Sequence, residues 1–204
     1  MPTASSIYQL KITLKNLRPP AWRRILLPTD STFRELHEVI QVAMGWSNSH
    51  LHQFSTKKHR GLFLDGVITD THLPEDIEPI EDAVDERDVR LCDRLRGAGD
   101  RCEYWYDFGD DWRHEVLLEK ILTPDPRMEY PICIGGKRQC PPDDCGGPWG
   151  YSDLLAILAD PKHKEHKEIL EWLCIDDPEE WDSEEFDLQA VNEELREPYG
   201  ALVF

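Results

Sequence analysis

The chain has 204 residues, seven of them tryptophan, and a hydrophobic fraction of 40%, which is enough to bury a core, so general disorder is excluded. No apolar run approaches the ~20 residues that a membrane helix needs, and the first residues lack the basic and apolar regions of a secretory signal. We therefore expect a soluble cytoplasmic protein with no membrane partner. The formal net charge of −18 argues against general nucleic-acid binding.

The acidic residues are concentrated in two segments. Residues 65–88 contain ten acids and one base, a net charge of −9, and residues 176–197 contain eleven acids and one base, a net charge of −10. The first 60 residues are basic, with nine Lys and Arg against three acids, a net charge of +6. A basic face could therefore still meet an anionic partner, and the acidic segments could meet a basic one.

The N-terminal part of the chain predicts two strands and a helix. Apolar and polar residues alternate over 8–14, which is typical of a half-buried strand, and a second strand is expected at 22–27 after a proline turn. Thr32 and Glu35 form a capping-box pattern before apolar residues at helical spacing. Gly45 then provides a natural end to this helix.

The middle of the chain predicts four further strands. Short strands at 50–54 and 62–64 are joined by a basic turn. Residues 65–88, with two prolines and little periodicity, predict a long acidic surface loop. Alternation resumes at 102–108 and 111–121, which predicts a hairpin.

The C-terminal part predicts helices. Ser152 can cap a helix that ends before Pro161, and further helices are expected over 164–173 and 188–195. We therefore expect a helical C-terminal part over residues 150–197.

Together these elements indicate an α+β fold with a mixed or antiparallel sheet, one early helix packed on that sheet, and a helical C-terminal third. No Gly/Ser linker divides the chain, so we expect a single domain over residues 1–204.

Several ordered segments of this chain resemble those of a known family. They are His50-Leu51-His52-Gln53-Phe54, Tyr106-Asp107-Phe108-Gly109-Asp110-Asp111-Trp112-Arg113-His114, Cys140-Pro141-Pro142-Asp143-Asp144-Cys145-Gly146-Gly147, Gly150-Tyr151, Phe186-Asp187-Leu188 and Val191-Asn192. The chain resembles the Ri-plasmid ORF-three-like family, whose members occur on plasmids, near mobile elements and in chromosomes. The resemblance runs from Tyr8 to Leu195 and implies an α+β single-domain fold, but no defined activity. Some members carry a resolvase-like label. Resolvase activity is not expected here, since this chain has no Arg-x-Ser nucleophile signature and no basic helix-turn-helix tail.

Four titratable side chains surround the expected two-residue turn of the hairpin, Gly109-Asp110. They are Asp107, Asp110, Asp111 and His114. Carboxylates and an imidazole at close range can bind a divalent metal or act as acid and base, so these four are the candidate catalytic residues. A structural role is favoured over a catalytic one: the aspartates accept hydrogen bonds from turn amides, and His114 is a half-buried strand residue.

His50 and His52 are two residues apart, so on a strand both would project to one face. With a carboxylate such as Asp107 they could form a two-histidine, one-carboxylate metal site. This spacing alone is weak evidence, and a divalent metal cofactor stays a hypothesis.

The six cysteines are expected to be reduced, small and largely buried. Cys140 and Cys145 are separated by four residues but lack a second pair of ligands at zinc spacing. The flanking Pro-Pro and Gly-Gly pairs indicate a rigid, structural loop instead.

The candidate binding residues are basic side chains of the first 60 residues and two aromatic residues. They are Arg23, Arg24, Lys57, Lys58, Arg60, Trp149 and Tyr151. The basic residues could grip phosphates, although acidic segments of the same molecule could neutralise them. Trp149 and Tyr151 lie beside the Gly-Gly loop and are the aromatic residues expected to be partly exposed.

The chain has no phosphate-binding P-loop, dinucleotide glycine fingerprint or nucleophile elbow. The leading hypothesis is therefore an interaction module whose acidic surfaces contact a basic protein partner. The first alternative is a metal-assisted hydrolase or nuclease that uses the His/Asp residues. The second is nucleic-acid binding through the basic face, which is not favoured.

Overall fold

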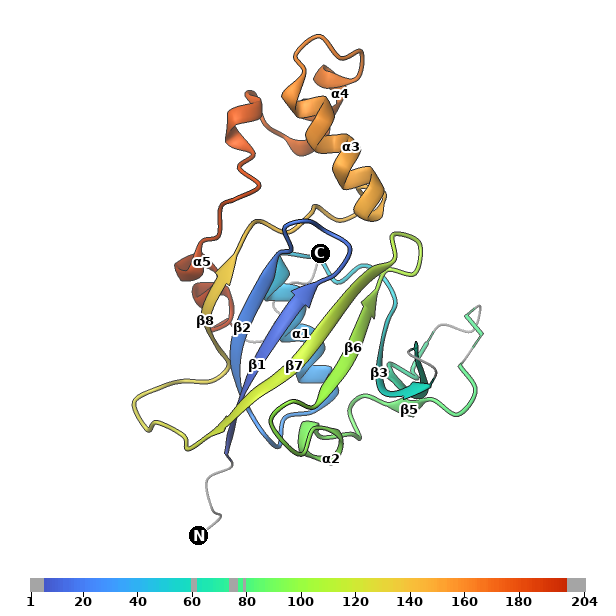
Figure 1. The fold of residues 1–204 in the computed structure, drawn as a ribbon, viewed down its shortest axis with the longest axis vertical. Coiled ribbons are helices and arrows are strands. Elements are labelled where there is room, and N and C mark those ends of the chain that lie inside the picture. Colours follow the sequence, from blue (N-terminus) through green and yellow to red (C-terminus); the bar gives the residue numbers. More distant parts are fainter. Residues whose placement is uncertain (1–5, 60–61, 74–76, 79, 198–204) are drawn as a thin grey trace.

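The computed structural model describes residues 6–59, 62–73, 77–78 and 80–197, with the backbone alone for 57–59 and 62–65. Its centre is an eight-stranded sheet in the order β5-β4-β3-β6-β7-β1-β2-β8 (Figure 1). Neighbouring strands are antiparallel except β4 and β5, which are parallel, so the sheet is mixed. The strands are β1 (Ile7–Leu14), β2 (Trp22–Pro28), β3 (His52–His59), β4 (Leu62–Thr69), β5 (Val84–Asp85), β6 (Arg101–Tyr106), β7 (Trp112–Leu122) and β8 (Ile132–Lys137).

The helices complete an α+β fold. They are α1 (Phe33–Met44), α2 (Leu91–Arg94), α3 (Gly147–Ala159), α4 (His166–Leu173) and α5 (Leu188–Glu194), with a short 3-10 turn, η1 (Pro178–Glu180). In Figure 1, α1 lies behind the sheet, α3 and α4 project beyond one end of it, and α5 lies beside β8. Among the described residues, no helix combines the length and apolarity needed to cross a bilayer.

Helix α1 follows the prediction from its capping box. The Thr32 side chain accepts a hydrogen bond from the Glu35 amide, and the Glu35 carboxylate accepts one from the Thr32 amide. Gly45 ends the helix with a φ of +78°, a left-handed conformation that glycine adopts without a Cβ penalty. The apolar face between these caps is fully buried against the sheet.

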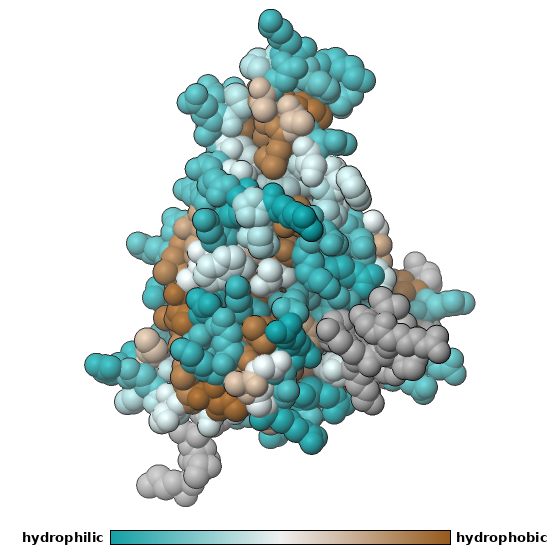
Figure 2. All heavy atoms as spheres, in the orientation of Figure 1, coloured by the Kyte–Doolittle hydropathy of each residue, from teal (hydrophilic) through white to brown (hydrophobic). Residues whose placement is uncertain are grey.

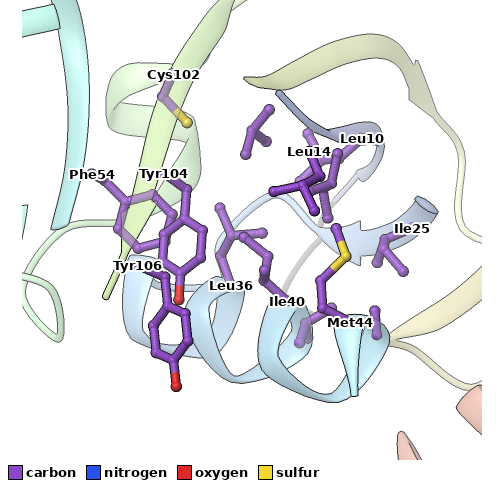
Figure 3. Packing of buried hydrophobic residues seen from close by; sticks show 14 of the residues in the cluster. Leu10, Leu14, Ile25, Leu36, Ile40, Met44, Phe54, Cys102, Tyr104 and Tyr106 are labelled. Atoms are coloured by element: carbon purple, nitrogen blue, oxygen red, sulfur yellow. The ribbon is translucent and has the colours of Figure 1, made fainter. Parts of the chain in front are cut away.

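The core lies between α1 and the inner face of the sheet. Figure 3 shows Leu36 of α1 beside Tyr104 of β6, and Met44 of α1 on the side of Ile25 of β2. These side chains are at most 4% exposed. Truncating a buried leucine such as Leu36 to alanine costs about 2–5 kcal/mol, because the transfer free energy is lost and a cavity remains.

Residues 65–88 do not form the structureless acidic loop that their composition predicts. Strand β4 continues to Thr69, and β5 pairs with it in parallel. Glu86 is fully buried and accepts hydrogen bonds from His52 (2.7 Å) and Arg34 (3.2 Å). An acidic residue can be buried in this way when cationic or hydrogen-bonding groups satisfy it.

Two further elements differ from the prediction. Strand β8 has no alternating pattern in the sequence, because Gly135 and Gly136 interrupt it. Helix α3 begins at Gly147 rather than near Ser152, after Gly146 in a left-handed conformation and with Pro148 in its first turn. The Ser152 hydroxyl donates to the Pro148 carbonyl (2.9 Å), as a residue within the helix does.

Candidate functional site

Three loops that are distant in the sequence meet at the end of the sheet from which α3 projects (Figure 1). The Asp107 amide donates to the Leu51 carbonyl (2.9 Å), which joins the β6–β7 turn to the α1–β3 loop. Ser47 donates from its amide (2.9 Å) and its hydroxyl (2.7 Å) to Asp143 Oδ2, which joins the α1–β3 loop to the β8–α3 loop. These loops carry the first three segments that suggested the family.

His50 lies where the three loops come closest. Its Nε2 is 3.1 Å from Asp144 Oδ1 and 3.8 Å from Asp107 Oδ2, and one donor atom of each residue lies within 4.8 Å of the others. The structure therefore brings together His50 and Asp107, two of the three residues in the metal hypothesis. It adds Asp144, a residue of the Cys140–Cys145 segment, whose sequence favours a structural connection over a reactive site.

His52 points elsewhere. The period-two argument placed His50 and His52 on one strand face, but β3 begins at His52 and His50 belongs to the preceding loop. His52 is buried, with Nε2 2.7 Å from Glu86 Oε2 and its ring stacked on that of His37 at 3.5 Å. Burial, together with the neighbouring His52, holds the pKa of His37 well below its usual value.

Asp107 organises the turn between β6 and β7. The turn spans the five residues 107–111, not the two-residue pair Gly109-Asp110, because Tyr106 pairs with Trp112. Asp107 Oδ1 accepts hydrogen bonds from the amides of Gly109 (2.9 Å) and Asp110 (3.2 Å). Its other carboxylate oxygen is left facing His50.

The other candidate catalytic residues have separate positions. Asp110 Oδ2 accepts a hydrogen bond from the Gly146 amide (3.1 Å), and Asp111 pairs with Arg113 (2.7 Å). His114 is fully buried, and desolvation lowers its pKa to about 3. The turn packs so closely on α3 that a Cβ on Gly147 would collide with the Asp110 carbonyl.

Three buried polar atoms at this junction make no hydrogen bond: His50 Nε2, the Tyr106 hydroxyl and Asp143 Oδ1. The His50 ring meets the Tyr106 ring edge-on, with centroids 5.7 Å apart. Burial is the main cause that raises the pKa of Tyr106, and the charge of Asp143 adds to it. Buried polar atoms without partners are uncommon and call for an explanation.

The cysteines are free, and Cys145 directly follows Asp144 in the β8–α3 loop. Cys140 is buried against Met44 and Arg23, and burial raises its pKa. Burial likewise raises the pKa of Cys145 to about 12, which disfavours the thiolate. In the described part of the chain, no group of three potential metal ligands includes a cysteine.

A second group of titratable residues consists of Asp70, His72 and Asp85. A cationic side chain of the protein, that of Arg87, already lies between them. The Arg87 guanidinium donates to Asp70 (2.9 Å) and Asp85 (3.2 Å) and lies 2.7 Å from His72 Nδ1. This arrangement is an ion-pair network at the surface. Despite desolvation, the Arg87 side chain lowers the pKa of Asp70, and hydrogen bonds from Thr71 and the Arg87 amide lower that of Asp85.

The candidate binding residues are dispersed. Arg23 is 3% exposed and donates to the Ala43 and Lys137 carbonyls, so its side chain faces inward. Arg24 forms a bidentate pair with Glu119 (2.6 and 2.9 Å) on the outer sheet face. The side chains of Lys57 and Lys58, and Arg60 altogether, lie outside the described residues.

The two aromatic candidates differ from each other. Trp149 is 85% exposed, whereas Tyr151 is 5% exposed and belongs to the core, which corrects the expectation of partial exposure. Both lie on α3, but Tyr151 shares the inward side of the helix with Leu154 and Leu158. Figure 2 shows an apolar area beneath the hydrophilic tip of the α3–α4 projection.

A groove of about 570 Å³ lies beside the junction, between the end of α1, the β8–α3 loop and residues 181–194, which we call the C-terminal arm. Its apolar lining consists of Val42, Ala43, Met44, Pro141, Pro142, Trp181, Phe186, Ala190 and Val191. Its acidic lining consists of Asp143, Glu185, Asp187 and Glu194. Sequence patterns could not reveal this groove, because the arm has to fold back across α1 to create it.

A mixed sheet backed by one long helix, with a junction of three loops at its end, defines an α+β protein with a candidate binding site. The chain matches the family model of the plasmid pRiA4b ORF-3-like protein over residues 6–190, and it belongs to that family. It is 37% identical over 169 residues to the uncharacterized protein y4hQ of Sinorhizobium fredii, covering 82% of this chain and 81% of that protein.

A solved structure has the same fold. The protein of unknown function MM3350 from Methanosarcina mazei is 36% identical in sequence, and its structure matches this one with a TM-score of 0.75. The match covers 92% of this chain and 98% of that chain. Neither the name of the family nor those of the two relatives gives an activity.

Proposed function

We propose that this protein is an interaction module that binds a basic segment of a partner protein in the groove beside the C-terminal arm. The observation that carries the proposal is the composition of the groove, which combines apolar walls with four carboxylates. A lysine or arginine can lay its aliphatic stem on apolar surface while its charged head reaches a carboxylate. An extended basic segment with interspersed apolar residues matches both properties.

The charge balance of the groove supports a cationic occupant. Arg23 is its one basic residue among the described lining residues, and it is buried and hydrogen-bonded to backbone carbonyls. The acids Glu185 and Glu194 are exposed. Opposite charges at such a surface raise the association rate and select against acidic partners.

The C-terminal arm is held in place, so the groove exists before a partner binds. Phe186 packs over the Arg23 guanidinium at 4.1 Å. Asn192 accepts from the Cys133 amide (2.8 Å) and donates to the Cys133 carbonyl (2.9 Å), which fastens α5 to β8. A preorganised site avoids part of the entropy cost of binding.

The acidic segment 65–88 is less suited to an external partner than the C-terminal arm. Asp70 and Asp85 bind Arg87, and Glu86 binds His52 and Arg34 inside the fold. These carboxylates stabilise the region around β5. We therefore assign the basic partner to the C-terminal arm, a sharper form of the hypothesis that both acidic segments take part.

Nucleic-acid binding has less support. Arg24 is paired with Glu119, and Arg113 is paired with both Glu103 and Asp111. These two cations of the outer sheet face therefore already have acidic partners within the protein, and phosphates would have to displace them.

The test is the binding of a fluorescein-labelled peptide of alternating lysine and leucine, measured by anisotropy. The variant E185Q/E194Q removes two groove charges, and E168Q/E179Q removes two exposed acids outside the groove as a matched control. We expect E185Q/E194Q to weaken binding roughly tenfold, since a favourable charge pair contributes about 1 kcal/mol or less, and E168Q/E179Q to have little effect. Equal affinity for both variants, or equal binding of a glutamate–leucine peptide, would contradict the proposal.

A further inference from the structure

We propose that His50, Asp107 and Asp144 form a binding site for a divalent transition-metal ion. This site lies beyond the groove function and uses none of the groove carboxylates. It combines one imidazole nitrogen with two carboxylate oxygens, and these three groups come from three different loops.

The distances fit co-ligands of one ion. His50 Nε2 is 3.1 Å from Asp144 Oδ1 and 3.8 Å from Asp107 Oδ2. A tetrahedral ion with bonds of about 2.0–2.2 Å separates its ligand atoms by roughly 3.3–3.6 Å. The two distances from His50 lie on either side of this range, and all three donor atoms lie within 4.8 Å of one another.

The hydrogen bonding provides a second, independent observation. His50 Nε2 is buried and makes no hydrogen bond, although Asp144 is close enough. The ring of the neighbouring, fully buried Tyr106 meets the His50 ring edge-on, and its hydroxyl lies against Ser49 and the His50 backbone. A metal ion would satisfy the imidazole nitrogen.

The turn orients the Asp107 ligand in advance. Asp107 Oδ1 is held by two turn amides, at 2.9 and 3.2 Å, which leaves Oδ2 directed at His50. Outer contacts of this kind fix ligand orientation in metal sites and strengthen metal binding. The Asp144 side chain is 68% exposed, so the ion would remain open to water or to an anionic ligand on its solvent side.

The donor set also selects the class of ion. Imidazole with carboxylates suits Zn²⁺, Fe²⁺, Mn²⁺ or Co²⁺, whereas all-oxygen sets suit Mg²⁺ and Ca²⁺. The cluster of Asp70, His72 and Asp85 is excluded as a second such site, because the Arg87 guanidinium occupies the position a cation would take.

The experiment is titration of the full chain with Co²⁺, followed by calorimetry and by visible absorption. The absorption spectrum separates a nitrogen–oxygen site from binding by thiolates, which adds an intense sulfur charge-transfer band. The variants are H50Q and D144N, and the matched control is D111N. Asp144 (φ +59°) and Asp111 (φ +57°) share a backbone conformation that asparagine also adopts, so the fold should be retained.

We expect one Co²⁺ per chain without a sulfur band, with affinity reduced roughly tenfold or more in H50Q and D144N and unchanged in D111N. Circular dichroism of each variant shows that it is folded. The proposal is overturned if the chain binds no Co²⁺, if the sulfur band dominates, or if H50Q and D144N bind as tightly as D111N.

Discussion

His37 and His114 are fully buried histidines whose pKa values in the folded protein are depressed by desolvation, that of His114 to about 3. In the unfolded chain both return to an ordinary value near 6.5. As the pH falls below about 6.5, the unfolded state binds protons that the folded state does not, so stability is lost. The loss continues until the pH reaches the folded-state values.

We predict that the free energy of unfolding falls by about 1.4 kcal/mol per histidine between pH 7.5 and 5.5. Urea denaturation at these two pH values measures it. Carboxylates with a lowered pKa, such as Glu119 at about 2, also stabilise the fold, but their contribution is lost only when the pH falls below their ordinary pKa values. Equal stability at the two pH values would contradict the assignment.

The residue patterns predicted part of the candidate metal site. They paired His50 with Asp107, which the structure places 3.8 Å apart. They could not find Asp144, because a β8–α3 loop with no periodic pattern brings it to His50. They also could not separate His50 from His52, since the point where a strand begins depends on its pairing partner.

At the scale of elements, the sequence predicts a helix or strand correctly where the pattern and the end signals lie within one segment. The capping box of α1 and the alternation of β1 predict these elements because each pattern is contained in one segment. Strands β5 and β8 have weak patterns of their own, and they form because β4 and β2 offer an edge with unpaired backbone groups.

The C-terminal arm depends on one glycine of β8. A Cβ on Gly136 would lie 2.6 Å from the Phe186 ring, so G136A should displace Phe186 and loosen the arm. A Cβ on Gly135 would meet nothing within 4 Å, which makes G135A the matched control. We expect G136A to lose about 1–3 kcal/mol of stability through overpacking.

Thermal denaturation and hydrogen exchange of α5 measure the effect of G136A. Exchange in α5 should accelerate in G136A and remain unchanged in G135A. If G136A and G135A had the same melting temperature and the same α5 exchange, the arm would not depend on this contact.

At the scale of the whole molecule, the net charge of −18 does not show which charged side chains are buried or paired and which are exposed. Composition identified the acidic segments correctly, but it could not show that Glu86 is a buried partner of His52 and Arg34. Nor could it show that Arg23 points into the core. The C-terminal arm keeps exposed carboxylates beside an apolar groove, and this is why we assign the partner to it.

The tryptophans of this protein allow a direct test of that assignment. Trp181 lines the groove, whereas Trp22 and Trp105 lie against Arg24 and Arg113 on the outer face of the sheet. The indole N–H signals in a nitrogen–proton correlation spectrum report each site during titration with the lysine–leucine peptide. We predict that the Trp181 signal shifts in a saturable manner while those of Trp22 and Trp105 do not. An unmoved Trp181 signal with shifts at Trp22 or Trp105 would contradict binding in the groove.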